Sequence, residues 1–415
     1  MKIAMLGHKR IPSREGGVEI VVEALATRMA AADHKVTVYN RSGHNVAGMV
    51  NDGFKYEKKY DYKGVHVITV NTPKSKSLNA VVYAYKAALK AALSDCDVVH
   101  FHAEGPCLAM PVAKLFGKKC VATIHGLDWK RAKWGSFATR MLKKGEKRAV
   151  KYADEIIVLS RDVQKYFEKT YGRKTVFIPN GVEDPKFAEP KSITMKYGLK
   201  GQDFILFLAR IVPEKGVHTL LKAYYKSDIE VPLVIAGGSS HSEDYYKTIK
   251  DMAERISHES SFKRSKKRVI LTGFVHGREL EELYTNNLFY VLPSDVEGMP
   301  ISLLEAMSYG NVCLVSDIPE NTDVIGEHGF TFEKGNAADL MKKMRDIINK
   351  MDKIRSDERM TRETIANYAV NKYNWDTVTK KTLNVYKKIA KSSGTRAKNA
   401  ASEAEDQNTS PETDA

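Results

Sequence analysis

The chain has 415 residues, of which 43% are hydrophobic and 28% charged, a balance that is ordinary for a soluble globular protein. This length fits two domains, each able to bury its own core. The longest uninterrupted apolar run, Phe204 to Ala209, is far shorter than the roughly 18 residues that a membrane-spanning helix needs. The composition therefore excludes a helical integral membrane protein.

The cysteines indicate a reducing compartment. Four of them are scattered along the chain without C-x-x-C spacing, at Cys96, Cys107, Cys120 and Cys313. This pattern favours buried thiols and argues against a structural zinc site. We also expect no signal peptide, because Gly7 and the polar residues at positions 8–10 interrupt the apolar N-terminal segment. We expect a cytoplasmic protein without a metal.

Net charge is +15, which invites an anionic partner such as a nucleic acid or an anionic membrane surface. Residues 130–151 hold nine Lys and Arg residues against one acid, Glu146, and Trp129, Trp134 and Phe137 are interleaved among them. A basic helix of this kind can lie in a lipid headgroup layer. It can equally be a solvated helix whose apolar side chains pack on the core, and both interpretations stay open.

The first half of the chain alternates strands and helices. It begins with a strand at residues 2–6, a loop containing Gly16 and Gly17, a helix at 18–31 and a strand at 36–39. This order is typical of a doubly wound domain, and paired glycines let main-chain amides approach a phosphate or a sugar. The G-x-G-x-x-G and P-loop fingerprints are absent, which argues against hydride transfer and ATP hydrolysis of those types.

The alternation continues and predicts a parallel sheet covered by helices on both faces. Further strands are expected at residues 65–70, 98–102, 120–124 and 155–159, with helices at 78–93 and near 108–116. His102 and His125 fall at strand ends, which is the edge where such sheets build their sites. A histidine at a strand end can equally be a structural residue.

A second α/β series follows the turn residues at 178–182. Its first strand, at residues 204–209, leads into a loop that carries Arg210 and Lys215. Two cations on a strand-to-helix loop can stabilise the negative charge that develops on a departing diphosphate.

The most informative stretch is residues 294–310. This stretch follows a strand expected at 288–292. Gly298 permits an unusual turn, and Pro300 suits the first position of a helix that runs to about Gly310. The amides and positive dipole end of this helix form a site for a phosphate. Glu297 and Glu305 flank that site and could hold hydroxyl groups on either side of a bound diphosphate.

The string EGMPISLLEAMSYG, at residues 297–310, resembles the E-x7-E segment of the retaining glycosyltransferases of family 4, enzymes with the GT-B fold. The resemblance implies that Glu297 contacts hydroxyls of the donor sugar and Glu305 the nucleotide ribose. The main chain between these acids would bind the diphosphate. The residues that it assigns to this part of the donor site are Gly298, Met299, Pro300, Ile301 and Leu303.

Other segments resemble the same family and imply further roles. TIHGLDWKRAKW, at residues 123–134, places His125 at the donor sugar. ARIVPEKG, at residues 209–216, makes Arg210 and Lys215 a clamp on the diphosphate. Together with Glu297, these three form the expected catalytic set. The remaining expectations are donor contacts at Gly16, Gly17 and the main chain of Val275, and acceptor-side candidates at His102, Glu104 and Asp128.

The resemblance implies an α/β fold of the GT-B type, in which two Rossmann-like domains with parallel sheets face a central cleft. The expected units are an acceptor-binding domain at 1–178, a donor-binding domain at 179–370, a helix crossing back at 371–390 and a disordered tail at 391–415.

The implied activity is transfer of a sugar, with retention, from a nucleotide-diphospho-sugar to a glycan or lipid-linked acceptor in surface polysaccharide or glycan synthesis. Neither a metal nor another cofactor would be needed, since Arg210, Lys215 and helix amides replace the metal. No nucleic acid partner is expected, and residues 130–151 could attach the protein to the inner face of the membrane. The alternatives are a nucleotide-sugar epimerase of the same fold and a basic polyanion-binding protein.

Overall fold

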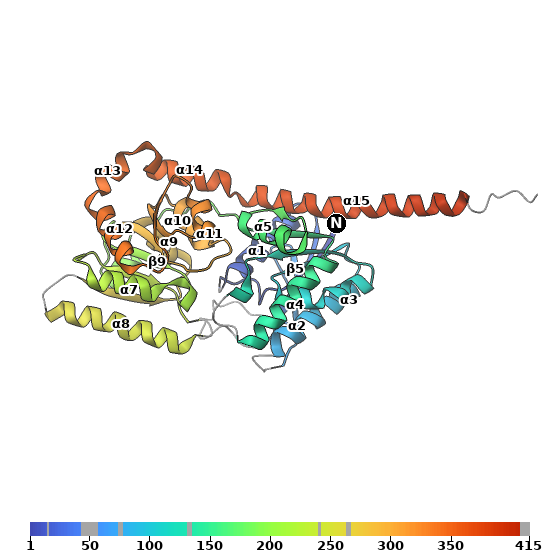
Figure 1. Cartoon of the computed structure of the whole chain (residues 1–415), viewed down its shortest axis with the longest axis horizontal. Coiled ribbons are helices and arrows are strands. Elements are labelled where there is room, and N and C mark those ends of the chain that lie inside the picture. Colours follow the sequence, from blue (N-terminus) through green and yellow to red (C-terminus); the bar gives the residue numbers. More distant parts are fainter. Residues whose placement is uncertain are drawn as a thin grey trace, which may run out of the picture.

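The computed structural model describes residues 1–14, 16–42, 57–73, 78–130, 135–239, 242–262 and 267–406. Its core is two sheets that form two α/β domains (Figure 1). The N-terminal sheet has the order β3-β4-β2-β1-β5-β6-β7-β8, and its strands pair in parallel except for β3 with β4. Its strands are β1 (Lys2–Leu6), β2 (Lys35–Arg41), β3 (Lys59–Tyr62), β4 (Val65–Val70), β5 (Val98–His102), β6 (Lys119–Ile124), β7 (Glu155–Val158) and β8 (Val176–Phe177).

Helices cover both faces of the N-terminal sheet, because apolar side chains of its central strands point alternately to each side. One face packs against α1 (Gly17–Ala31) and the start of α15 (Trp375–Asp406). The other packs against α2 (Leu78–Ala92), α3 (Met110–Leu115), α4 (Ser136–Tyr152) and α5 (Arg161–Tyr171). Short 3-10 turns at Gly105–Ala109 and Asp128–Lys130 precede α3 and α4.

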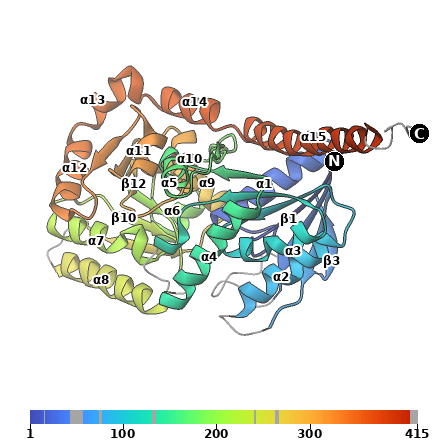
Figure 2. The same cartoon turned by 45° about the vertical axis from the view of Figure 1, so that its right-hand side comes forward.

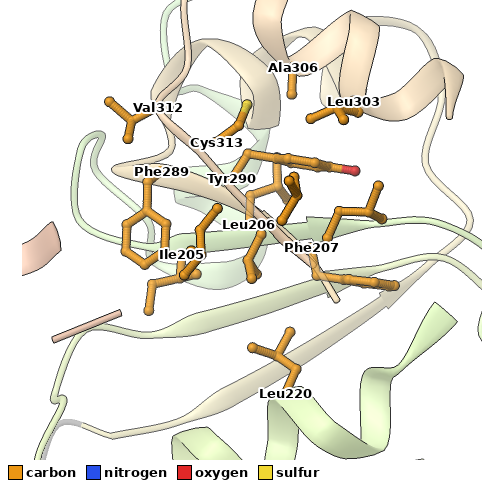
Figure 3. Packing of buried hydrophobic residues seen from close by; sticks show 14 of the residues in the cluster. Ile205, Leu206, Phe207, Leu220, Phe289, Tyr290, Leu303, Ala306, Val312 and Cys313 are labelled. Carbon is orange, nitrogen blue, oxygen red and sulfur yellow. The ribbon is translucent and has the colours of Figure 1, made fainter. Parts of the chain in front are cut away.

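The C-terminal sheet is parallel throughout and has the order β11-β10-β9-β12-β13-β14. Its strands are β9 (Ile205–Leu208), β10 (Leu233–Ala236), β11 (Val269–Gly273), β12 (Phe289–Leu292), β13 (Cys313–Ser316) and β14 (Phe330–Phe332). Figure 3 shows side chains of β9 and β12 packed between Leu303 of one helix and Leu220 of another. This packing fixes the carboxyl ends of β9 and β12 beside each other.

The helices around this sheet complete the C-terminal domain. They are α6 (Ser192–Tyr197), α7 (Val217–Lys226), α8 (Glu243–Phe262), α9 (Gly277–Asn286), α10 (Ile301–Ser308), α11 (Pro319–Ile325), α12 (Ala337–Asn349), α13 (Met351–Ser356) and α14 (Arg362–Lys372), with 3-10 turns at Pro213–Lys215 and Glu358–Met360. Within the described ranges, no helix is long and apolar enough to cross a membrane.

The chain crosses between the domains twice, and the two crossings lie side by side. The amide of Val182 donates to the carbonyl oxygen of Tyr373 at 2.7 Å, and a Cβ on Gly181 would overlap the ring of Trp375. After the second crossing, α15 packs on α1 and runs along the N-terminal domain (Figure 2). The two domains are therefore joined by a paired connection rather than by a single linker.

The backbone of α15 continues to Asp406, whereas the sequence analysis predicts disorder from residue 391. Ala, Lys, Arg and Glu are frequent at residues 391–406 and favour a helix once α15 has been nucleated upstream. Residues 407–415 lie outside the described part of the chain.

Candidate active site

The loop between β12 and α10 forms the centre of the site. It leaves the carboxyl edge of the C-terminal sheet and carries Glu297 and Gly298 to the start of α10. Pro300 is the N-cap residue with φ −76°, one position earlier than the sequence predicts, and it has no amide hydrogen to offer a ligand. Leu303 is fully buried and its amide donates to the carbonyl of Pro300 at 3.2 Å. The diphosphate contact expected from the amide of Leu303 is thus not available, because that amide is used inside the helix.

Glu297 is buried and held on one side by a cation. Its Oε1 accepts from the ammonium group of Lys215 and from the hydroxyl of Ser294, the latter at 2.6 Å. Lys215 comes from the loop after β9, and β9 lies beside β12, so the sheet order brings the two side chains together. The sequence predicts both residues as parts of one site, and the structure places them in direct contact.

Glu305 lies in the second turn of α10 and is held from both domains. Its Oε1 accepts from the guanidinium of Arg14, which lies in the loop between β1 and α1 of the N-terminal domain. Its Oε2 accepts from the hydroxyl of the buried Tyr284 at 3.0 Å. The Glu305 carboxylate also raises the pKa of the Arg14 guanidinium, because the two charges attract each other.

The two domains meet at the start of α10. A Cβ on Gly298 would overlap the carbonyl oxygen of His125, and a Cβ on Gly126 would lie 3.0 Å from the Cα of Gly298. Gly17, the first residue of α1, is less crowded, because a Cβ placed on it would lie 3.5 Å from Cδ1 of Ile301, at ordinary contact distance. Glycines at these positions therefore let the loops that carry His125 and Glu297 touch backbone to backbone.

The hinge segment also contacts this loop. The side-chain amide of Asn180 donates to the carbonyl oxygen of Met299 at 3.1 Å, and its main-chain amide lies 3.0 Å from the sulfur of Met299. Both residues are buried. A change in the angle between the domains would strain these bonds, so the hinge and the loop before α10 are mechanically linked.

The other expected donor contacts lie at the same edge of the C-terminal sheet. Arg210 follows β9 and is half-buried in the loop that also carries Lys215. Val275 lies two residues beyond the end of β11, the edge strand, and packs against the core. Gly16 precedes α1 in an extended conformation. All three thus lie in loops that follow strands at the carboxyl edges of the sheets.

Three histidines form a buried row in the N-terminal domain. Nδ1 of His102 lies 3.1 Å from Nε2 of His125, and the rings of His100 and His102 have their centroids 4.0 Å apart. His100 is bonded to the hydroxyls of Tyr386 in α15, at 2.6 Å, and of Thr123, at 2.7 Å. Burial lowers the pKa of His100 to about 3 and that of His102 well below its usual value. His100 and His102 are therefore neutral, and the row connects α15 to the loop that meets Gly298.

One of the acceptor-side candidates, Glu104, is a buried acid. Glu104 is fully buried, and among the described residues neither of its carboxylate oxygens has a hydrogen-bond partner. Burial, together with the carboxylates of Asp128 and Glu146, raises the pKa of Glu104 to about 10. Glu104 is therefore protonated at neutral pH. Of the three acceptor-side candidates, His102 and Glu104 are fully buried, and Asp128 is half-buried on the 3-10 turn.

Glu146 is a structural anchor that the sequence analysis does not assign. Its carboxylate accepts from the indole of Trp129 at 2.9 Å, from Tyr166 at 2.9 Å and from Tyr171. The ammonium group of Lys143 lies 4.3 Å from the centre of the Trp129 ring. The one signal in the sequence was that Glu146 is the only acid among nine cations, which is typical of a buried, bonded carboxylate. The residues 131–134 of this basic stretch lie outside the described part of the chain.

Arg14 and Tyr284 are also absent from the predicted site. Arg14 precedes the Gly16–Gly17 pair at the carboxyl edge of the N-terminal sheet, and that position is its only sequence signal. Tyr284 lies in α9, whose sequence gives no indication of a site. Within the described residues, no group of three or more His, Cys, Asp or Glu side chains is arranged to hold a metal ion.

Comparisons with known proteins identify the family. The model of the glycosyltransferase family 4 matches residues 15–185, and the model of the glycosyl transferases group 1 matches residues 192–367. The two matches follow one another along the chain and cover both domains. The chain belongs to the family 4 glycosyltransferases.

A curated relative of this family 4 glycosyltransferase is the GDP-mannose-dependent alpha-(1-6)-phosphatidylinositol monomannoside mannosyltransferase of Mycolicibacterium smegmatis. It is 26% identical over 319 residues, which are 72% of this chain and 76% of the relative. The protein is thus a glycosyltransferase.

Solved structures establish the fold of this family 4 glycosyltransferase. The sucrose-phosphate synthase of Thermosynechococcus elongatus superposes with a TM-score of 0.76 at 18% identity, covering 94% of this chain and 98% of that one. Anabaena HepE, solved in complex with UDP-glucose, superposes with a TM-score of 0.72 at 16% identity, covering 93% and 99%. The expected GT-B fold, with two parallel-sheet α/β domains, is confirmed.

Gly298→Ala should separate the two domains. The added methyl group would overlap the carbonyl of His125, and forcing it into place costs about 1–3 kcal/mol unless the domains move apart. We expect a larger radius of gyration in small-angle X-ray scattering. Gly135→Ala is the control, because Gly135 has φ −65° and a Cβ there meets no described atom within 4 Å. An unchanged scattering profile of Gly298→Ala would contradict the contact.

Glu104→Gln should stabilise the protein, increasingly so at higher pH. The pKa of Glu104 is raised from its ordinary value near 4.5 to about 10 in the folded protein. Between these two values the folded protein holds a proton that the unfolded chain has lost, so the free energy of unfolding of the wild type falls as pH rises from 4.5 toward 10. Glutamine keeps the shape without the proton uptake. We expect equal melting temperatures near pH 4.5 and a gain of at least about 2 °C for the variant at pH 8. A melting difference that does not grow with pH would refute the buried neutral acid.

Proposed function

We propose that this glycosyltransferase transfers a sugar from a nucleotide-diphospho-sugar to a glycan or lipid-linked acceptor, with retention of the anomeric configuration and without a metal ion. The observation that carries the proposal is the arrangement of charged groups around the N-terminus of α10. Glu297 and Glu305 flank that helix end, and Lys215 lies against the first of them. A donor with hydroxyl groups at both ends and a diphosphate between them fits this order of acids and cations.

The relatives support a donor of this class. The Mycolicibacterium relative is named for its dependence on GDP-mannose, and Anabaena HepE was solved with UDP-glucose. In both donors a hexose is joined to a nucleoside through a diphosphate. The site described above offers carboxylates for the sugar and the ribose, and cations with helix amides for the diphosphate, so we place the same class of donor here.

The position of Glu297 favours a binding role over a nucleophilic one. Retention through a covalent intermediate would require a free carboxylate that attacks the anomeric carbon. Oε1 of Glu297 already accepts two hydrogen bonds, one from a cation, which stabilise its charge and lower its nucleophilicity. We therefore favour displacement on one face. The bond from the anomeric carbon to the phosphate oxygen breaks, the acceptor oxygen bonds to that carbon on the same side, and the acceptor proton passes to the leaving diphosphate.

The cations supply what a metal ion provides in other transferases. Negative charge develops on the β-phosphate as the sugar departs, and Lys215 and Arg210 lie in the loop that faces the start of α10. Fixed cations there stabilise the transition state more than the ground state, which is the condition for catalysis. His125 would lie at the sugar, held in place by His102.

A lipid-linked acceptor would explain the exposed face of α4. Five basic residues are exposed on this helix: Arg140, Lys143, Lys144, Lys147 and Lys151. Phe137 on the same helix is 69% exposed, and Leu115 at the end of the adjacent α3 is 85% exposed. Cations beside exposed apolar side chains suit the headgroup layer of an anionic membrane. We therefore propose that the enzyme acts at the inner face of the membrane, in the assembly of a surface polysaccharide or glycan.

The donor proposal is tested by calorimetry with UDP, GDP, ADP and dTDP in EDTA, followed by transfer assays with the sugar donor of whichever nucleotide binds. Glu297→Gln should bind that nucleotide about as well as the wild type, because Glu297 contacts only the sugar. Its transfer rate should fall by about 100-fold, since the sugar is no longer held for attack. Proton NMR of the first product should show the anomeric configuration of the donor.

Three results would count against this function. Near-normal transfer by Glu297→Gln would remove its role at the sugar, and an inverted product would remove retention. Conversion of the donor sugar without transfer to an acceptor would favour the epimerase alternative.

Membrane attachment is tested by co-sedimentation with vesicles of phosphatidylglycerol and phosphatidylcholine. We expect binding at low salt that weakens by 0.5 M salt, and at least a tenfold loss in the variant Arg140→Glu/Lys144→Glu/Lys147→Glu, since each cation near an anionic surface contributes about 1 kcal/mol. The matched control reverses three exposed lysines of the C-terminal domain, Lys247, Lys250 and Lys353. Equal loss in both variants would show that only net charge matters.

A further inference from the structure

Arg14 connects the N-terminal domain to the donor half of the site. It lies in the loop after β1, and its guanidinium donates to Oε1 of Glu305 in α10 of the other domain. The side chain of Arg14 is 46% exposed and that of Glu305 is 17% exposed, so the pair lies at the rim of the contact between the domains. The other oxygen of Glu305 is fixed by Tyr284. Arg14 is therefore the partner of Glu305 that can leave without breaking the C-terminal domain.

Both acids beside the N-terminus of α10 are paired with a cation in the same way. Glu297 holds Lys215, from the loop after β9, and Glu305 holds Arg14, from the loop after β1. Each of the two acids thus has a cation of this chain as its partner. A nucleotide-diphospho-sugar presents hydroxyl groups that can donate to the two carboxylates and two negative charges that can accept from the cations, so each group of both ion pairs keeps a hydrogen-bond partner after the exchange.

We propose that Arg14 is a donor-binding residue that exchanges Glu305 for the diphosphate when the nucleotide binds. This inference rests on the donor class proposed above. Glu305 is the fifth residue of α10, so its carboxylate lies about 6 Å along the axis from the helix N-terminus, within the reach of an arginine side chain. Hydroxyl groups of the ribose then donate to the carboxylate of Glu305, which Arg14 has left. The guanidinium of Arg14 donates to the phosphate oxygens, which match its planar arrangement of N–H groups.

The exchange would make cleavage of the donor depend on the position of the N-terminal domain. Lys215 and Arg210 belong to the C-terminal domain, and they can meet the diphosphate whatever the angle between the domains. Arg14 reaches it only when the loop after β1 lies against α10, as it does where Gly17 faces Ile301. Full stabilisation of the leaving group then requires closed domains, which also exclude water from the reacting sugar.

The test compares binding of nucleoside diphosphates with binding of the nucleosides alone, by calorimetry on the full chain. GDP and UDP are titrated first into the wild type, and the one that binds is then compared with guanosine or uridine. Arg14→Gln should lower the affinity for the nucleoside diphosphate by about tenfold or more, because a charged hydrogen bond to phosphate is lost. The same variant should bind the nucleoside as well as the wild type, or a few-fold more tightly, because Glu305 is freed for the ribose.

Two further variants complete the test. Arg14→Lys keeps the positive charge but lacks the paired N–H donors of a guanidinium. It should bind the nucleoside diphosphate more tightly than Arg14→Gln and less tightly than the wild type. Arg255→Gln is the matched control, since it removes an exposed arginine that pairs with Glu259 on α8, and it should leave both affinities unchanged. Circular dichroism melting confirms that each variant is folded.

The other outcomes each overturn the assignment. An unchanged or higher diphosphate affinity in Arg14→Gln would mean that Arg14 only pairs with Glu305 and does not bind the nucleotide. An equal loss for nucleoside and diphosphate would mean that Arg14 acts only by holding Glu305 in place. Failure of the wild type to bind any of UDP, GDP, ADP and dTDP would instead refute the donor class itself, and the exchange with it.

Discussion

The structure depends on one backbone contact, between Gly298 in the loop before α10 and the His125–Gly126 segment after β6. Neither side of this contact has room for a Cβ atom. The two residues that we propose at the donor sugar, Glu297 and His125, therefore lie on loops that are in direct contact. Since the two loops belong to different domains, the geometry of the site is set by how the domains are joined and not by either sheet alone.

The paired crossing of the chain controls that geometry. The hinge bonds to the start of the last helix through Val182 and Tyr373, and it bonds to the loop before α10 through Asn180 and Met299. On the other side, α15 is tied to the N-terminal domain by the hydrogen bond from Tyr386 to His100. A rotation of the domains must therefore pass through a few buried polar bonds, which is a structural reason to expect hinge motion with discrete positions rather than free movement.

The sequence predicts the central strands well because each is a buried apolar run. The family resemblance predicts Glu297 and Lys215 as parts of one site, and the sheet order, with β9 beside β12, brings their loops together. It fails where the signal is weak or distant. The strand Lys59–Tyr62 is charged, half-exposed and antiparallel, and the strand Val176–Phe177 has only two residues, so neither has a recognisable pattern. Arg14 could not be assigned because its partner is 291 residues away in another domain, and no local spacing encodes such a contact.

Buried polar groups, rather than apolar packing alone, hold the loops of the N-terminal domain in place. Three donors surround Glu146 and so fix Trp129 next to Asp128, while the histidine row fixes the loop at His125. Such groups tolerate only one arrangement, because any shift would leave a buried donor or acceptor unpaired at a cost of about 1–3 kcal/mol. The proposed acceptor side of the site is therefore preorganised, whereas the proposed donor side is held by the ion pairs of Glu297 with Lys215 and of Glu305 with Arg14. This asymmetry favours an order of events in which the donor rearranges the cleft and the acceptor meets a surface that is already formed.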